Sequence, residues 1–291
     1  MNLEVALSGI PTHAVASAVT DALKSSGFLI VTSPELPLEL QQKALRAASE
    51  ILHTKSSSIV ITHPTDPKIY AMLNGIDFNI DGTVSPEAIQ DLTEWYRAVR
   101  SARDILLKCI AIGLGVDDPN FFVTLHNQHN DSLRLLRYHP GDETTGNRCK
   151  EHSDYGTLTL LLTDGVGGLE AFVDGEWKPV PYVEGAIVVN IGSILSEWTG
   201  HQLSATLHRV AGPASLGSNT PMEALMRAVS VPRISIAYFA DPNADVHIAL
   251  QGDEKNSMKI SDYILMRSGG IGRERDGVAF TTTEKDRLEK S

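Results

Sequence analysis

The sequence predicts an α+β fold in which a mainly helical N-terminal region packs against an antiparallel β core. Apolar residues recur at helical spacing through much of residues 11–115, whereas the sequence from residue 132 onward consists of short β-rich runs separated by turns. No helical pattern separates these runs. This disfavours a parallel sheet built from βαβ units and favours an antiparallel sandwich or barrel.

Two helices and one early strand are expected in the N-terminal region. Residues 38–52 carry apolar side chains at helical spacing, and residues 86–114 place theirs on one stripe before Gly113 and Gly115 end the helix. Ahead of both, the run G-F-L-I-V-T, which ends at Thr32, is typical of a short buried strand.

The second half contains five strand-like runs: L-R-L-L-R-Y, G-T-L-T-L-L-L-T, G-L-E-A-F-V, G-A-I-V-V-N-I-G and R-I-S-I-A-Y-F-A. Asp174 and Gly175 predict a two-residue hairpin, because both residue types tolerate positive φ. We expect one structural unit with three parts. Residues 1–120 form the helical region, residues 121–266 form the β core, and residues 267–291 form a C-terminal tail or lid.

The composition limits the classes of partner. The chain has 291 residues, of which 42% are hydrophobic and 21% charged, which is enough to bury a sizeable core. Its formal net charge of -11 provides no overall basic field for nucleic acid or an anionic membrane. We therefore expect a small-molecule substrate, no nucleic acid and no membrane, while the oligomeric state is left open.

The cysteines and the N-terminus predict the compartment. Cys109 and Cys149 are too few for a disulfide framework and form no C-x-x-C pair. The first residues lack a basic stretch followed by a long apolar run, and no window approaches the roughly 20 apolar residues of a bilayer span. We expect a soluble, cytoplasmic protein.

His152 and Asp154 lie two positions apart in the run K-E-H-S-D-Y-G-T-L-T-L. On a β-strand such side chains share one face, so the two can reach a common point. H-x-D alone is a weak pattern, because most occurrences are exposed turn residues or a hydrogen-bonded pair. The pair gains weight from His208, which begins the run H-R-V further along the chain.

Two histidines and one carboxylate suit a non-haem Fe(II) centre, because they fill one face of an octahedron and leave three positions open. A structural zinc site would need a fourth ligand, usually a thiolate, and neither cysteine belongs to this pattern. The other histidines are weaker candidates because they lack a carboxylate partner at strand spacing or lie in a polar loop, a cap or a featureless strand: His13, His53, His63, His126, His129, His201 and His247.

Arg233 and Ser235 also lie two positions apart on an expected strand. A guanidinium and a hydroxyl on one strand face can hold a carboxylate, and the arginine fork supplies bidentate hydrogen bonds. Taken alone, the pair would more often be an exposed arginine beside a solvated serine. After H-x-D and a distal H-R, the carboxylate-binding interpretation is the stronger one.

The order H-S-D, H-R-V and R-I-S on an all-β second half resembles the Fe(II)- and 2-oxoglutarate-dependent oxygenases of the isopenicillin N synthase-like group. The similarity covers about residues 133–242 and includes Y-H-P, G-G-L-E-A-F, W-K-P-V-P and G-A-I-V-V-N-I-G-S-I-L-S-E-W-T. The resemblance implies a double-stranded β-helix (jelly-roll) core. It also implies an oxygenase of secondary metabolism that uses Fe(II), 2-oxoglutarate and O2 to hydroxylate, desaturate or cyclise a small molecule.

Residue by residue, the resemblance implies that iron is bound by His152, Asp154 and His208. It also implies that Arg233 and Ser235 hold the distal carboxylate of 2-oxoglutarate. A carboxylate at position 154 argues against halogenation, which in related enzymes needs a small residue there.

Three further residues of the first core strand are candidates by resemblance. Tyr138 matches a tyrosine that often contacts the cosubstrate. Arg134 and Arg137 loosely resemble the R-x-R-Y-F-P pattern of deacetoxycephalosporin C synthase, and either could face a substrate carboxylate. Their odd spacing places at most one of them on the inner face of a strand.

The sequence departs from the family pattern in several places. His139 stands where proline, tyrosine or phenylalanine is common, and Ser193 stands where many relatives have aspartate after N-x-G. The segment between His208 and Arg233 is longer than usual, and its insert, residues 212–230, is a candidate loop over the site.

Two other functions remain open. In isopenicillin N synthase an R-x-S pair holds the substrate's own carboxylate, so the motif is also compatible with an iron oxidase that needs no 2-oxoglutarate. A β-sandwich binding protein without turnover is the second alternative, although no ligand of the triad is missing. A cupin would show clustered G-x-H-x-H ligands, which the sequence lacks.

Overall fold

The computed structural model describes residues 4–7, 9, 11–54, 60–62, 68–74, 84–141, 145–215, 229–249 and 257–267. The largest sheet has eight strands, in spatial order β1 (Glu4–Ala6), β2 (Phe28–Thr32), β10 (Ile187–Ile191), β7 (Leu158–Thr163), β12 (Arg233–Ala240), β5 (Ser132–Tyr138), β4 (Lys68–Asn74) and β3 (Val60–Thr62). All its pairs are antiparallel except β1 with β2.

The second sheet has four antiparallel strands, in the order β6 (Cys149–His152), β11 (His208–Val210), β8 (Leu169–Val173) and β9 (Glu176–Pro179). The predicted hairpin connects β8 to β9, with φ of 56° at Asp174 and 80° at Gly175. A separate two-stranded sheet pairs β13 (His247–Ala249) with β14 (Ser257–Lys259). The antiparallel core that the sequence predicts is therefore confirmed.

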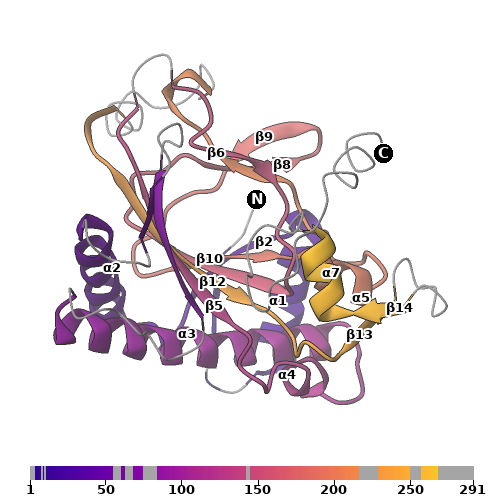
Figure 1. The fold of residues 1–291 in the computed structure, drawn as a ribbon. Helices are drawn as coiled ribbons and strands as arrows, with labels where there is room; N and C mark the ends of the chain where they lie inside the picture. Colours follow the sequence, from indigo (N-terminus) through magenta and orange to yellow (C-terminus); the bar gives the residue numbers. More distant parts are fainter. Residues whose placement is uncertain are drawn as a thin grey trace.

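Three long helices cover one face of the eight-stranded sheet: α1 (His13–Ser26), α2 (Leu38–His53) and α3 (Pro86–Gly113). Figure 1 shows α3 running along this face, with the β8–β9 hairpin on the far side of the molecule. Two of these helices, α1 and α3, have local start or stop signals. Thr12 and Ser85 cap the starts of α1 and α3, and Gly27 ends α1 at a φ of 72°.

The structure also contains shorter helices: α4 (Phe121–Thr124), α5 (Ser193–Trp198), the 3-10 helix η1 (Pro213–Ser215) and α7 (Ile260–Arg267). In Figure 1, α7 lies beside α5 and the β13–β14 pair. Among the described residues, no helix combines the length and the apolarity that crossing a membrane requires.

Side-chain alternation on β5 separates the two cores. Leu133 and Leu135 are buried in the main cluster with the helices, whereas Leu136 and Tyr138 pack in a cluster that includes Val210 of the four-stranded sheet. The inner face of the large sheet therefore faces the smaller sheet. The pocket described below lies between them.

The N-terminal region is less purely helical than the sequence suggests. β4 pairs with β5 along its whole length, from Lys68 opposite Tyr138 to Asn74 opposite Ser132. Its run K-I-Y-A-M-L-N lies between Pro67 and the turn signal N-G at residue 74, but the sequence analysis did not identify it as a strand. The division at residue 120 stays a prediction, and so does the tail or lid at residues 267–291, which except for Arg267 lies outside the described residues.

Candidate metal centre and its pocket

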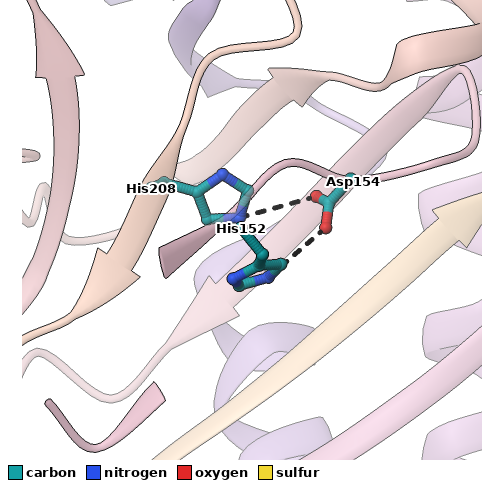
Figure 2. A group of neighbouring side chains, drawn as sticks. All are labelled: His152, Asp154 and His208. Carbon is teal, nitrogen blue, oxygen red and sulfur yellow. Dashed lines mark ion pairs between the residues drawn. The ribbon is translucent and has the colours of Figure 1, made fainter. Parts of the chain in front are cut away.

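His152, Asp154 and His208 come together at the edge of the four-stranded sheet. His152 is the last residue of β6, His208 is the first of β11, and the two lie directly opposite each other in the strand pair. Figure 2 shows the three side chains pointing toward one another. Their potential ligand atoms all lie within 4.8 Å of one another.

Asp154 does not share a strand with His152, so the expectation of a single strand face was wrong. β6 ends at His152, and Asp154 lies in the connection that crosses to β7 of the other sheet. The backbone carbonyl of Asp154 accepts hydrogen bonds from the backbone N–H of Ser193, at 2.8 Å, and from the Ser193 hydroxyl, at 2.9 Å. These bonds, rather than strand geometry, fix the position of the carboxylate.

Both imidazoles present Nε2 to the shared space. His152 Nδ1 lies 2.8 Å from the carbonyl oxygen of Lys150, and His208 Nδ1 lies 3.0 Å from that of Thr206. A carbonyl oxygen can only accept, so each Nδ1 carries the proton and each Nε2 keeps a lone pair for a metal. The Nε2 atoms lie 3.7 Å (His152) and 3.8 Å (His208) from the two oxygens of Asp154 (Figure 2).

The Asp154 carboxylate is oriented by two hydrogen bonds to one oxygen. Oδ2 accepts from Thr159 Oγ1 at 2.5 Å and from Asn190 Nδ2 at 2.8 Å. Burial alone would raise the pKa of Asp154, but the two histidines and these hydrogen bonds outweigh it, and the pKa is lowered. The carboxylate is therefore held ionised, as a metal ligand must be.

The sequence analysis did not identify Thr159, Asn190 and Ser193 as site residues. Thr159 and Asn190 lie on neighbouring strands, β7 and β10, and are directly paired in the sheet. A polar residue at an inward position of an otherwise apolar strand, as in V-V-N-I and T-L-T-L, was the available signal.

The imidazole of His152 is suited to bind metal in the neutral form. Burial lowers the pKa of His152, and the nearby His208 lowers it further. The ring centroids of the two histidines are 4.4 Å apart, and Phe28 packs edge-on against His208. Two imidazole nitrogens and one carboxylate are the donor set that suits Fe(II) with positions left open.

A pocket of about 590 Å³, counting the part open to solvent, extends from these three residues between the two sheets. Its walls are largely apolar and include Leu136, Leu161, Leu169, Val210, Ala237 and Phe239.

The pocket is also lined by Arg233, Ser235 and Tyr138, which lie away from the three candidate metal ligands. Arg233 and Ser235 are each 1% exposed, and Arg233 donates from Nη1 to Ser235 Oγ at 3.1 Å. The guanidinium carbon lies 5.2 Å from the ring centroid of Tyr138, which is the residue opposite Arg233 in the β12–β5 pair. Among the described residues, the buried Nε of Arg233 has no hydrogen-bond partner, so the group has capacity for an anion.

Arg134 and Arg137 point to opposite faces of β5. Arg134 lines the pocket, on the face shared with Leu136 and Tyr138. Arg137 is not among the lining residues, and its Nη1 lies 3.4 Å from His139 Nδ1. Of these two candidates, the structure brings only Arg134 to the site.

The remaining histidines lie away from the metal centre wherever they are described. His201 is exposed, has a φ of 61° and pairs with Glu197, as expected of a residue at a helix end. His126 lies in the turn that follows α4, as expected, but it is only 1% exposed. It is buried because its ring bonds the Phe122 carbonyl and the Thr157 hydroxyl. His63 and most of the 212–230 insert, residues 216–228, lie outside the described residues.

Comparison with known proteins shows which family the segment around these residues resembles. Residues 129–242 match the profile of the 2OG-Fe(II) oxygenase superfamily. "Proline hydroxylase buaE" of Petromyces alliaceus is 35% identical over 168 residues, which cover 54% of this chain and 49% of that protein. "2-oxoglutarate-dependent dioxygenase htyE" of Aspergillus rugulosus is 35% identical over 161 residues, which cover 52% and 46%. The chain thus spans about half the length of the curated relatives it matches.

The fold matches solved structures along most of the chain. The dioxygenase for auxin oxidation of rice superimposes with a TM-score of 0.70 at 20% identity, covering 92% of this chain and 97% of that one. This likeness supports the jelly-roll core. The segment that matches the 2OG-Fe(II) oxygenase superfamily contains all three metal ligands as well as Arg233 and Ser235.

Proposed function

We propose that this protein is an Fe(II)- and 2-oxoglutarate-dependent oxygenase that oxidises a C–H bond of a small molecule, by hydroxylation, desaturation or ring formation, in secondary metabolism. The observation that carries the proposal is the arrangement of one pocket. It has three metal ligands on one side and a buried guanidinium–hydroxyl pair on the other. That arrangement suits a dicarboxylate with a 2-oxo group, which can chelate a metal at one end and pair with arginine at the other.

Each residue of the pocket has a defined task in this proposal. His152, Asp154 and His208 hold the metal, and Thr159 and Asn190 keep the carboxylate turned toward it. When bound, Fe(II) with 2-oxoglutarate supplies the activation of O2 and the oxidation of the substrate.

The far end of the pocket positions the cosubstrate in this proposal. Arg233 and Ser235 bind its distal carboxylate, and Tyr138, which lies beside the guanidinium, forms the adjacent wall. The apolar side chains of the remaining wall limit the access of water to the reacting groups. We also propose a cytoplasmic location, in keeping with two unpaired thiols, Cys109 and Cys149.

An anaerobic titration tests the proposal. Purified protein loaded with Fe(II) under nitrogen is titrated with 2-oxoglutarate, and binding is followed by the visible charge-transfer absorption of the iron–2-oxo acid chelate. Admission of air is then expected to release succinate. Arg233→Met is expected to weaken 2-oxoglutarate binding by roughly ten-fold or more, because it removes a charge-assisted, buried interaction.

The same titration separates the two alternatives. An oxidase without a cosubstrate would bind iron but show no absorption change and no succinate. A binding protein without turnover would show neither succinate nor oxygen consumption with any substrate. Arg137→Met is the matched control for Arg233→Met, since Arg137 lies on the neighbouring strand and outside the pocket.

A further inference from the structure

Arg134 lies in the pocket at a different level from Arg233. In the β5–β12 pair, Arg233 is opposite Tyr138, whereas Arg134 is opposite Ala237. The two arginine levels are thus four residues apart along the strands, or about 13 Å at the usual rise per residue. One carboxylate held by Arg233 and Ser235 does not also reach the level of Arg134.

The level of Arg134 is the one nearer the metal ligands. Its guanidinium carbon lies 5.1 Å from the ring centroid of Phe239. Phe239 is opposite Thr159 in the β12–β7 pair, and Thr159 donates its hydroxyl hydrogen bond to Asp154. A group bound by Arg134 therefore lies on the metal side of the cosubstrate's arginine.

Two aromatic rings hold the guanidinium in place. Besides Phe239, Tyr70 of β4 has its ring centroid 5.9 Å from the guanidinium carbon of Arg134. Cation–π contacts of this kind orient a guanidinium but supply no hydrogen-bond acceptors in its plane. Among the described residues the buried Nε of Arg134 has no hydrogen-bond partner.

Among the described residues that line the pocket, Asp154 is the single acid, and Arg134 and Arg233 are two of the cations. Asp154 is turned toward the two histidines, and the distal carboxylate of 2-oxoglutarate is assigned to Arg233. A partly buried guanidinium without an anion is unfavourable, so we expect a negatively charged group of a bound ligand beside Arg134.

We propose that the primary substrate carries a carboxylate and that Arg134 binds it. This inference rests on the proposed function and names its substrate class. The walls around Arg134 are apolar, with Leu136, Ala237 and Phe239 nearby on the same face of the sheet. The part of the substrate that is oxidised is therefore apolar, and the carboxylate fixes which C–H bond faces the metal.

Matched acid and amide pairs test the inference without turnover. Protein loaded with Fe(II) and 2-oxoglutarate under nitrogen is titrated with hexanoate and hexanamide, and with phenylacetate and phenylacetamide. Broadening of the ligand's proton signals by the paramagnetic iron reports binding close to the metal. At least one acid is expected to bind about ten-fold more tightly than its amide, as a charge-assisted bidentate contact implies.

Variants of three arginines test which of them is responsible for the tighter binding of the acids. Arg134→Met, with Arg134→Gln as a second variant if the first folds poorly, is expected to abolish the acid preference and to leave 2-oxoglutarate affinity within about two-fold. Arg137→Met, on the same strand but outside the pocket, is expected to keep both properties. Arg233→Met is expected to lose 2-oxoglutarate affinity and, at saturating cosubstrate, to keep the acid preference.

Several results would overturn the inference. These are equal binding or no binding of acid and amide by the wild-type protein, an acid preference that survives in both Arg134 variants, and a loss of 2-oxoglutarate affinity in those variants as large as that in Arg233→Met. If 2-oxoglutarate itself fails to bind the wild-type protein, the proposed function fails. The acid and amide comparison with Fe(II) alone still decides the role of Arg134.

Discussion

His208 lies directly opposite His152 in the antiparallel pair of β11 and β6, with the two imidazole centroids 4.4 Å apart. Because side chains alternate between faces, a shift of one residue in this register would turn one imidazole away from the other. The metal centre therefore depends on the correct pairing of two short strands that are far apart in the sequence.

Removal of one histidine is expected to abolish stable iron binding. His208→Ala leaves one imidazole and one carboxylate, and the iron retained after dialysis should fall from about one ion per chain to nearly none. His201→Ala is the matched control, because His201 is exposed and pairs with Glu197 outside the pocket. Equal iron content in both variants, measured by elemental analysis, would contradict the assigned ligands.

The hydrogen bond from Thr159 to Asp154 is expected to contribute to metal affinity. Thr159→Val keeps the shape of the side chain but removes the 2.5 Å bond that orients Asp154 Oδ2. The dissociation constant for Fe(II) should rise by roughly ten-fold, the lower end of the effect of such supporting contacts. Competition with a chelator under nitrogen measures it. Thr93→Val is the control, since the Thr93 hydroxyl bonds only to the backbone of its own helix among the described residues.

The ligands and the core strands could be predicted because their signals are local or specific. The alternating runs around Leu135, Leu160 and Ile236 are strands in the structure, as expected. His152 and His208 were found from residue type and order together. For these residues, what matters is chemical identity, which the sequence shows directly.

Other features depend on tertiary contacts that a single sequence does not show. Asp154 lies off the strand because Ser193, from a segment far along the chain, bonds its backbone. The spacing of Arg134 and Arg137 indicated that at most one points inward, but it could not indicate which. That choice depends on which face of β5 packs against the helices, and Leu133 and Leu135 settle it only once the sheet is assembled.

The buried pair of Arg103 and Asp131 is expected to stabilise the fold behind the large sheet. Their side chains are 1% and 0% exposed, with Arg103 Nη1 3.3 Å from Asp131 Oδ1. Asp131→Ala leaves a buried guanidinium with one fewer partner and should lower the free energy of unfolding by about 3–5 kcal/mol. Glu39→Ala removes the exposed pair with Lys43 and should change stability little. Urea denaturation compares the two, and a similar small change in both would argue against the buried pair.

His126 is expected to make the folded protein less stable at acidic pH. Burial lowers the pKa of His126 from 6.5 to about 3, with the Arg103 charge acting in the same direction. Both ring nitrogens have an oxygen partner, since Nδ1 lies 2.6 Å from the Phe122 carbonyl oxygen and Nε2 lies 2.8 Å from Thr157 Oγ1. Below pH 6.5 His126 therefore binds a proton in the unfolded chain but stays neutral in the folded chain until about pH 3.

The lowered pKa of His126 determines how the free energy of unfolding should depend on pH. Above pH 6.5 His126 is neutral in both states and contributes no pH dependence, whereas between pH 6.5 and about 3 it should lower the free energy of unfolding by up to about 1.4 kcal/mol per pH unit. His126→Gln removes the titrating group, so its unfolding free energy should fall less steeply over this window, whatever its value at neutral pH. Urea denaturation at several pH values gives both slopes. Equal slopes would mean that His126 is already protonated in the folded protein, which its burial and the charge of Arg103 disfavour.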